Sequence, residues 1–62
     1  MDTATLADLL RETEARHGTY EASAPAHHWA DWYAAYIVAR ENGRSPDEAA
    51  DDAAFHLERL QR

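Results

Sequence analysis

Both tryptophans and two of the three tyrosines of this 62-residue chain lie within residues 27–40. At 100° per residue, the bulky side chains of this stretch share one face of a helix: Trp29, Trp32, Tyr33, Tyr36, Ile37 and Arg40. Large side chains are scarce elsewhere in the chain. We therefore expect a central helix, with the other segments packed around its aromatic face.

The chain is long enough for one domain, residues 1–62, but short for a self-sufficient core. Much of its 45% hydrophobic content is alanine, which buries little apolar surface. It has no cysteine, which excludes a disulfide or a thiolate zinc site as a compensating staple. Association with another chain is the remaining way to compensate for the small core, so we expect a homo-oligomer or a complex with a protein partner.

The formal net charge of −6 disfavours binding to nucleic-acid phosphates or to anionic membranes, because both need a concentrated basic surface. Basic or cationic partners fit this charge better. The N-terminal residues 1–5 lack the basic and apolar regions of a signal peptide, and no apolar run approaches the ~20 residues of a membrane span. We expect a cytoplasmic protein.

Three helices are expected, over residues 5–17, 25–42 and 46–61. The first would begin at Thr5, which can cap the helix with Asp8 in its first turn, and would end at Gly18. The second would carry Pro25 in its first turn and stop at Asn42-Gly43.

The clearest start signal is Ser45-Pro46-Asp47-Glu48, an N-cap serine, an N1 proline and a capping-box glutamate. The stop at Asn42-Gly43 lies so close to this cap that the second and third helices must form a tight αα-hairpin. The inward side of the third helix should be Ala50, Ala53, Ala54, Leu57 and Leu60. The sequence thus predicts an all-α fold, a small three-helix bundle.

The sharpest metal candidate is His27-His28-x-x-Asp31, whose spacing could place two ligands on one side of a helix. A zinc or iron site usually needs three or four protein ligands, and His17 or His56 could complete this one only if the fold brings them near. We expect no metal and no cofactor, with His27 and His28 in a partly exposed helix start.

The chain lacks the motifs of a catalytic triad, a glycine-rich phosphate loop or a nucleophile elbow. We therefore predict that it is not an enzyme. Phe55 lies among charged neighbours on the third helix and is interpreted as an intermolecular contact. Arg40 could either stack on the aromatic face or extend from the helix end. The candidate binding residues are Trp29, Trp32, Tyr33, Tyr36, Arg40 and Phe55.

A longer pattern covers most of the chain from Leu6 onward. It consists of His27-His28-Trp29-x-Asp31-Trp32-Tyr33-Ala34-Ala35-Tyr36, followed by Ala39-Arg40, Gly43 and Ser45-Pro46-x-Glu48-Ala49. This pattern resembles a group of very short bacterial helical proteins, some of which are labelled bleomycin resistance protein. The label implies an acidic aromatic groove that binds a flat cationic drug by stacking and charge.

Two functions are therefore considered. The first is a non-enzymatic small helical protein that acts through self-association or partner docking. The alternative is a protein that binds a cationic aromatic drug or a metal, through the aromatic face or through His27, His28 and Asp31.

Overall fold

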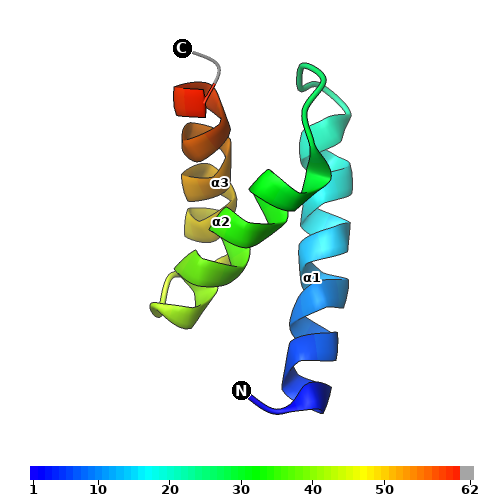
Figure 1. Ribbon diagram of the computed structural model, residues 1–62, viewed down its shortest axis with the longest axis vertical. Helices are drawn as coiled ribbons and strands as arrows, with labels where there is room; N and C mark the ends of the chain where they lie inside the picture. Colours follow the sequence, from blue (N-terminus) through cyan, green and yellow to red (C-terminus); the bar gives the residue numbers. More distant parts are fainter. Residues whose placement is uncertain (61–62) are drawn as a thin grey trace.

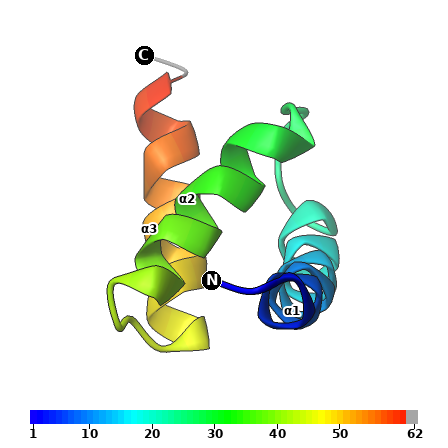
Figure 2. The same cartoon turned by 60° about the horizontal axis from the view of Figure 1, so that its bottom comes forward.

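The computed structural model describes residues 1–60, which form three α-helices and no strand (Figure 1). The helices are α1 (Thr3–Glu21), α2 (Trp29–Glu41) and α3 (Pro46–Leu60). Helix α2 lies between the other two in the chain and packs against both, most extensively against α3 (Figures 1 and 2). The predicted all-α three-helix bundle with an α2–α3 hairpin is confirmed. Within residues 1–60, no helix combines the length and the apolar character needed to cross a lipid bilayer.

The turn between α2 and α3 forms as its sequence signals predict. Asn42 caps the end of α2, and Gly43 adopts a φ of 86°, a left-handed conformation that favours glycine. The Ser45 Oγ accepts a hydrogen bond from the Glu48 amide at 3.2 Å, and the Glu48 carboxylate accepts one from the Ser45 amide at 2.9 Å. This reciprocal capping box fixes the first residue of α3.

Helix α1 is longer at both ends than predicted. It begins two residues earlier than Thr5, because the Asp2 carboxylate caps it by accepting a hydrogen bond from the Thr5 amide at 2.9 Å. It also passes through Gly18 and continues to Glu21. A glycine inside a helix costs about 1 kcal/mol relative to alanine. Tyr20, beyond this glycine, packs on the core, which offsets that cost.

The predicted start of α2 at Pro25 is also wrong, because the helix begins at Trp29. His28 is the N-cap, and its Nδ1 accepts a hydrogen bond from the Ala30 amide at 3.1 Å. His27 lies in the segment before the helix, where its Nδ1 is 2.9 Å from the Pro25 carbonyl oxygen. The His28 side chain therefore fixes the start of α2.

The core forms where α2 meets the small residues of α3. Trp32 and Tyr36 are fully buried and their rings stack at 5.2 Å between centroids. The remaining buried apolar residues are Ala39, Ala49, Ala53 and Leu57. Buried alanines thus pack beside two large rings, which lets α2 and α3 approach closely.

The expected inward side of α3 is correct only in part. Ala53 and Leu57 are buried as predicted. Leu60 is 55% exposed, so its predicted place on the inward side is wrong. Ala49, which the helical pattern did not select, is completely buried. The buried side of α3 therefore follows Ala49, Ala53 and Leu57, which are spaced four residues apart.

Candidate functional site

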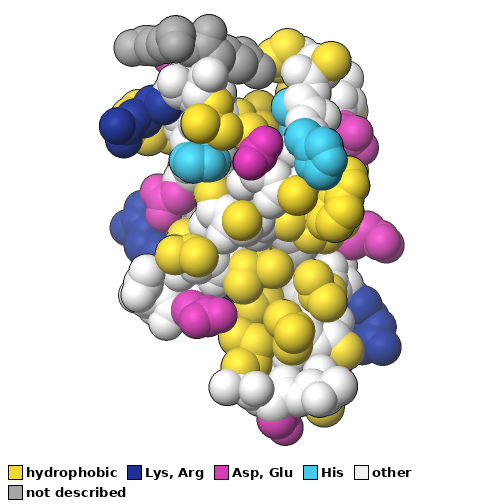
Figure 3. All heavy atoms as spheres, viewed as in Figure 1, with side chains coloured by type: hydrophobic (Ala, Val, Ile, Leu, Met, Phe, Trp, Pro, Cys, Tyr) yellow, Lys and Arg dark blue, Asp and Glu magenta, His cyan; other side chains and the backbone are white. Residues whose placement is uncertain are grey.

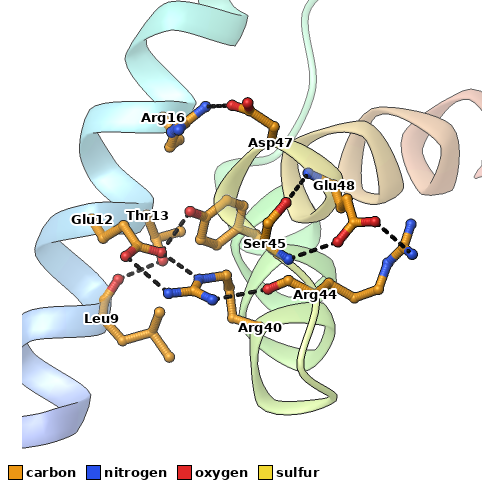
Figure 4. Close-up of polar contacts among 10 residues, drawn as sticks. Leu9, Glu12, Thr13, Arg16, Arg40, Arg44, Ser45, Asp47 and Glu48 are labelled. Atoms are coloured by element: carbon orange, nitrogen blue, oxygen red, sulfur yellow. Dashed lines mark hydrogen bonds and ion pairs between the residues drawn. The ribbon is translucent and has the colours of Figure 1, made fainter.

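A polar network joins α1 to the α2–α3 hairpin (Figure 4). The Glu12 carboxylate of α1 accepts hydrogen bonds from the Tyr36 hydroxyl at 2.6 Å and from the Arg40 Nε at 2.8 Å. The Arg40 Nη1 also donates to the Arg44 carbonyl oxygen at 2.8 Å. The sequence suggested that Arg40 either stacks on a ring or extends into solvent, and the structure shows neither. Arg40 instead pairs with a carboxylate from another helix.

The network also shifts the acidity of its members. Hydrogen bonds from Arg40 and then from Tyr36 hold the pKa of Glu12 below its usual range. Burial, followed by the hydrogen bond to Glu12, raises the pKa of Tyr36 to about 12. Both shifts favour the ionisation state that each group already has near neutral pH. The network therefore fits a structural link between helices better than an acid–base pair, because acid–base catalysis needs a group whose pKa lies near the working pH.

A second cluster lies where the end of α1 approaches the segment before α2. The Nε2 atoms of His17 and His27 are 2.8 Å apart, and the Glu21 carboxylate is 3.7 Å from the His17 Nδ1. One donor atom from each of these three residues lies within 4.8 Å of the others. His17 is buried, with 6% of its surface exposed, and His27 is half-buried.

The cluster differs from the predicted one. His28 is occupied as the cap of α2, and Asp31 is exposed on that helix. Of the two histidines that could have joined His27, the fold brings His17 to it, while His56 lines a groove between α2 and α3. Glu21 was missed. Its i+4 spacing from His17 was visible, but the helix was expected to end at Gly18.

The candidate aromatic binding residues occupy three different environments. Trp32 and Tyr36 are completely buried, and Tyr33 is half-buried. Trp29 is 57% exposed and contacts the Tyr33 ring edge-on, with the centroids 5.1 Å apart. Phe55 is 60% exposed on α3, with the Arg59 guanidinium 5.9 Å from its ring centroid. The aromatic stripe is thus mainly core, and only its edge reaches the surface.

Apolar side chains nevertheless remain exposed on both α1 and α2. Trp29, Ala34 and Val38 of α2 are exposed, as are Leu6 and Leu10 of α1. Figure 3 shows hydrophobic side chains gathered over α1 and α2 on the face where α2 lies in front. Leu6 and Leu10 lie one turn apart on α1 and are about 40% exposed. Ala34 and Val38 lie one turn apart on α2, whereas Trp29 lies on the opposite side of that helix from Val38. We call Ala34 and Val38 the α2 surface.

A groove of ≈ 540 Å³ runs along α2 and α3 beside this surface. Asp52 and His56 of α3 form part of its lining. The rest is mainly small apolar side chains of α2, namely Ala34, Ala35, Val38 and Ala39. Its lining charges are Arg44 and Asp52, which pair at 2.9 Å. The groove floor therefore carries no unbalanced charge.

Comparisons with known proteins give no assignment. The chain matches no family model, no curated protein and no solved structure. The resemblance to short bacterial helical proteins stays a prediction, and so does the drug-binding activity that it implies.

Proposed function

We propose that the protein is a non-enzymatic helical module that self-associates through its α2 surface. The observation that carries this proposal is the distribution of large apolar side chains. Within residues 1–60, three of them are buried in the core, Trp32, Tyr36 and Leu57, and Leu9, Tyr20 and Tyr33 pack partly buried against it. More lie exposed, namely Met1, Leu6, Leu10, Trp29, Val38, Phe55 and Leu60.

This exposure does not come from an extended shape. The accessible surface of 4311 Å² is close to the ~4,000 Å² expected for a compact monomer of this mass. A compact chain with this many exposed apolar side chains gains free energy when a partner covers them, at roughly 25 cal/mol per Å² of apolar surface. A partner on the α2 surface would cover Ala34, Val38 and the groove that they line.

A second copy of the chain fits this surface better than an unrelated acidic protein. The chain carries a net charge of −6, so two copies repel each other over most orientations. Repulsion is smallest where charge is sparse or internally paired, as along the groove containing Arg44 and Asp52. Two α2–α3 hairpins packed on this side would form a four-helix arrangement typical of small helical dimers.

The drug-binding alternative receives less support. Stacking on the complete aromatic face would require Trp32 and Tyr36 to leave the core, because both are fully buried. Of the tryptophans, only Trp29 offers an exposed ring to a flat ligand.

The test is Val38→Glu, compared with Ala15→Glu by sedimentation equilibrium at micromolar concentration. Val38 is 58% exposed in the α2 surface, so the substitution adds a charge to the contact and removes nothing from the core. Ala15 is exposed on α1, about 200° around the helix from the buried Thr13. Both variants gain the same charge on a helix exterior.

The wild type should have at least twice the 7.0 kDa mass of one chain. Val38→Glu should become a monomer with its helicity retained, whereas Ala15→Glu should associate like the wild type. Phe55→Ser should weaken association, because Phe55 is exposed about one helical turn after Asp52, which lines the groove. A wild-type monomer with a cooperative thermal transition would contradict the proposal. Equal dissociation by Ala15→Glu would place the contact elsewhere.

A further inference from the structure

We infer that His17, Glu21 and His27 form a binding site for a late first-row divalent metal ion, such as Zn²⁺ or Ni²⁺. Neither the sequence motif around His27 nor the proposed self-association requires this site. The local motif offered two histidines and an aspartate on one helix. The fold instead assembles ligands from the last turns of α1 and from the segment before α2.

The bonding of His27 identifies which nitrogen would bind the metal. A carbonyl oxygen can only accept a hydrogen bond, so the His27 Nδ1, 2.9 Å from the Pro25 oxygen, carries the proton. The neutral ring then presents its Nε2 lone pair to His17. Backbone carbonyls hold metal-binding histidines in this way in many proteins, because the bond fixes both the tautomer and the ring orientation.

The spacing of the two imidazoles fits one metal ion. With metal–nitrogen bonds of about 2.05 Å, the Nε2 separation of 2.8 Å corresponds to an angle of roughly 85° at the metal. This is near the ~90° of octahedral or square-planar coordination, which suits Ni²⁺ or Cu²⁺. Tetrahedral Zn²⁺ needs about 3.3 Å, which is a ring displacement of about half an ångström.

Glu21 supplies the third ligand from one helical turn beyond His17. Donor atoms on one metal lie at most about 4 Å apart, so the outer limit of 4.8 Å within the cluster must close slightly. The Glu21 side chain is 60% exposed and has room to rotate toward the two rings. Two imidazoles and a carboxylate are ligands for Zn²⁺ and Ni²⁺, whereas Mg²⁺ prefers oxygen ligands and several waters.

The surroundings hold the rings in position and favour a cation. The His17 ring contacts the Trp32 and Tyr33 rings, both at 5.3 Å between centroids, and the Tyr20 ring lies 5.3 Å from His27. The charges that act on the neighbouring Tyr33 are the carboxylates of Glu14 and Glu21. Rings fixed by packing lose little entropy on metal binding, and a locally negative field attracts the ion.

The experiment is calorimetric titration of the purified wild-type chain with ZnCl₂ and with NiCl₂, and with MgCl₂ as the control ion. We expect saturable binding of Zn²⁺ or Ni²⁺ with one ion per chain, no saturable heat with Mg²⁺, and a melting temperature that rises with metal concentration. His27→Gln should weaken binding at least about 10-fold.

Glu21→Gln and His56→Gln separate metal binding from structural effects. Glu21→Gln should weaken binding while leaving the metal-free melting temperature unchanged, because Glu21 is exposed. His56→Gln removes an exposed histidine outside the cluster and should bind like the wild type. The proposal is overturned if neither Zn²⁺ nor Ni²⁺ gives saturable heat, or if Glu21→Gln and His27→Gln both retain wild-type affinity. Equal loss of affinity in His56→Gln would also overturn it.

Discussion

The α2–α3 hairpin and helix α1 are held in place by different interactions. In the hairpin, two stacked rings of α2 lie among alanines of α3, and the turn between the helices is closed by a reciprocal cap. Helix α1 packs less extensively on the rest of the molecule. Its attachment combines the apolar packing of Leu9 and Tyr20 with several directed polar contacts. These are Glu12 with Tyr36 and Arg40, Arg16 with Asp47, and His17 with His27.

This difference indicates where the fold should open first. Packing of apolar groups is non-directional and tolerates small displacements, whereas a hydrogen bond weakens steeply when its geometry is lost. Helix α1 should therefore separate from the hairpin in partial unfolding, while α2 and α3 remain together. The predictions below test this order.

The largest effect should follow from Trp32→Ala, because Trp32 of α2 contacts side chains of both the hairpin and α1. Its ring stacks on Tyr36 and lies 5.7 Å from the Tyr20 ring of α1. The substitution should cost about 3–5 kcal/mol, most of the roughly 3–9 kcal/mol available to a domain of this size. Urea unfolding followed by circular dichroism measures the loss.

Trp32→Phe is the matched control. The Trp32 Nε1 is buried without a hydrogen-bond partner, so phenylalanine removes an unsatisfied donor while keeping an aromatic ring. This variant should lose less than half the stability lost by Trp32→Ala. Wild-type stability in Trp32→Ala would show that the core is elsewhere.

Glu12→Ala should loosen α1 without disrupting the hairpin. It leaves the buried Tyr36 hydroxyl unpaired, at a cost of about 1–3 kcal/mol. Amide hydrogen exchange should accelerate in α1 more than in α2 and α3. The double variant Glu12→Ala/Tyr36→Phe should recover part of the loss, because it removes the unpaired hydroxyl. Uniform acceleration along the chain would contradict separate opening of α1.

Ser45→Ala should cost about 1 kcal/mol, because Ser45 caps α3 through the Glu48 amide. Thr5→Ala should have almost no effect, since Asp2 and not Thr5 caps α1. Thermal unfolding of both variants measures the difference. A larger loss for Thr5→Ala would restore the cap first predicted from the sequence.

The smallest effects should appear as pH dependence. The pKa of Glu12 is lower in the folded chain than its ordinary value of 4.5, so its contribution is present above that value and is lost as pH falls through the folded pKa. The raised pKa of Tyr36 acts oppositely, and its contribution is lost as pH rises from 10.0 to about 12. Urea midpoints across pH should show the acid loss reduced in Glu12→Gln and the alkaline loss reduced in Tyr36→Phe.

The hairpin was predictable because its signals are local. The Asn42-Gly43 stop and the cap formed by Ser45 and Glu48 act within a few residues, so no distant part of the chain is needed to interpret them. The termini of α1 and the start of α2 were mispredicted because other interactions competed with the local preference. Packing of Tyr20 extended α1 beyond Gly18, and a histidine cap moved the start of α2.

The candidate site could be predicted only as a set of residue types. Spacing along a helix placed His27 with His28 and Asp31, but the tertiary structure pairs His27 with His17 and Glu21. That choice depends on how α1 lies against the segment before α2, which no local pattern encodes. Arg40 shows the same limit, because its partner Glu12 is 28 residues away in the chain.

By itself the sequence determined the helical class, the central aromatic helix and the α2–α3 turn, because helical periodicity and capping chemistry act over a few residues. Only the tertiary structure decided which aromatic rings are buried, which apolar side chains stay exposed and which histidines meet. Those outcomes depend on the angle and phase at which three helices pack. Packing optimises all their contacts together, and no single segment fixes it.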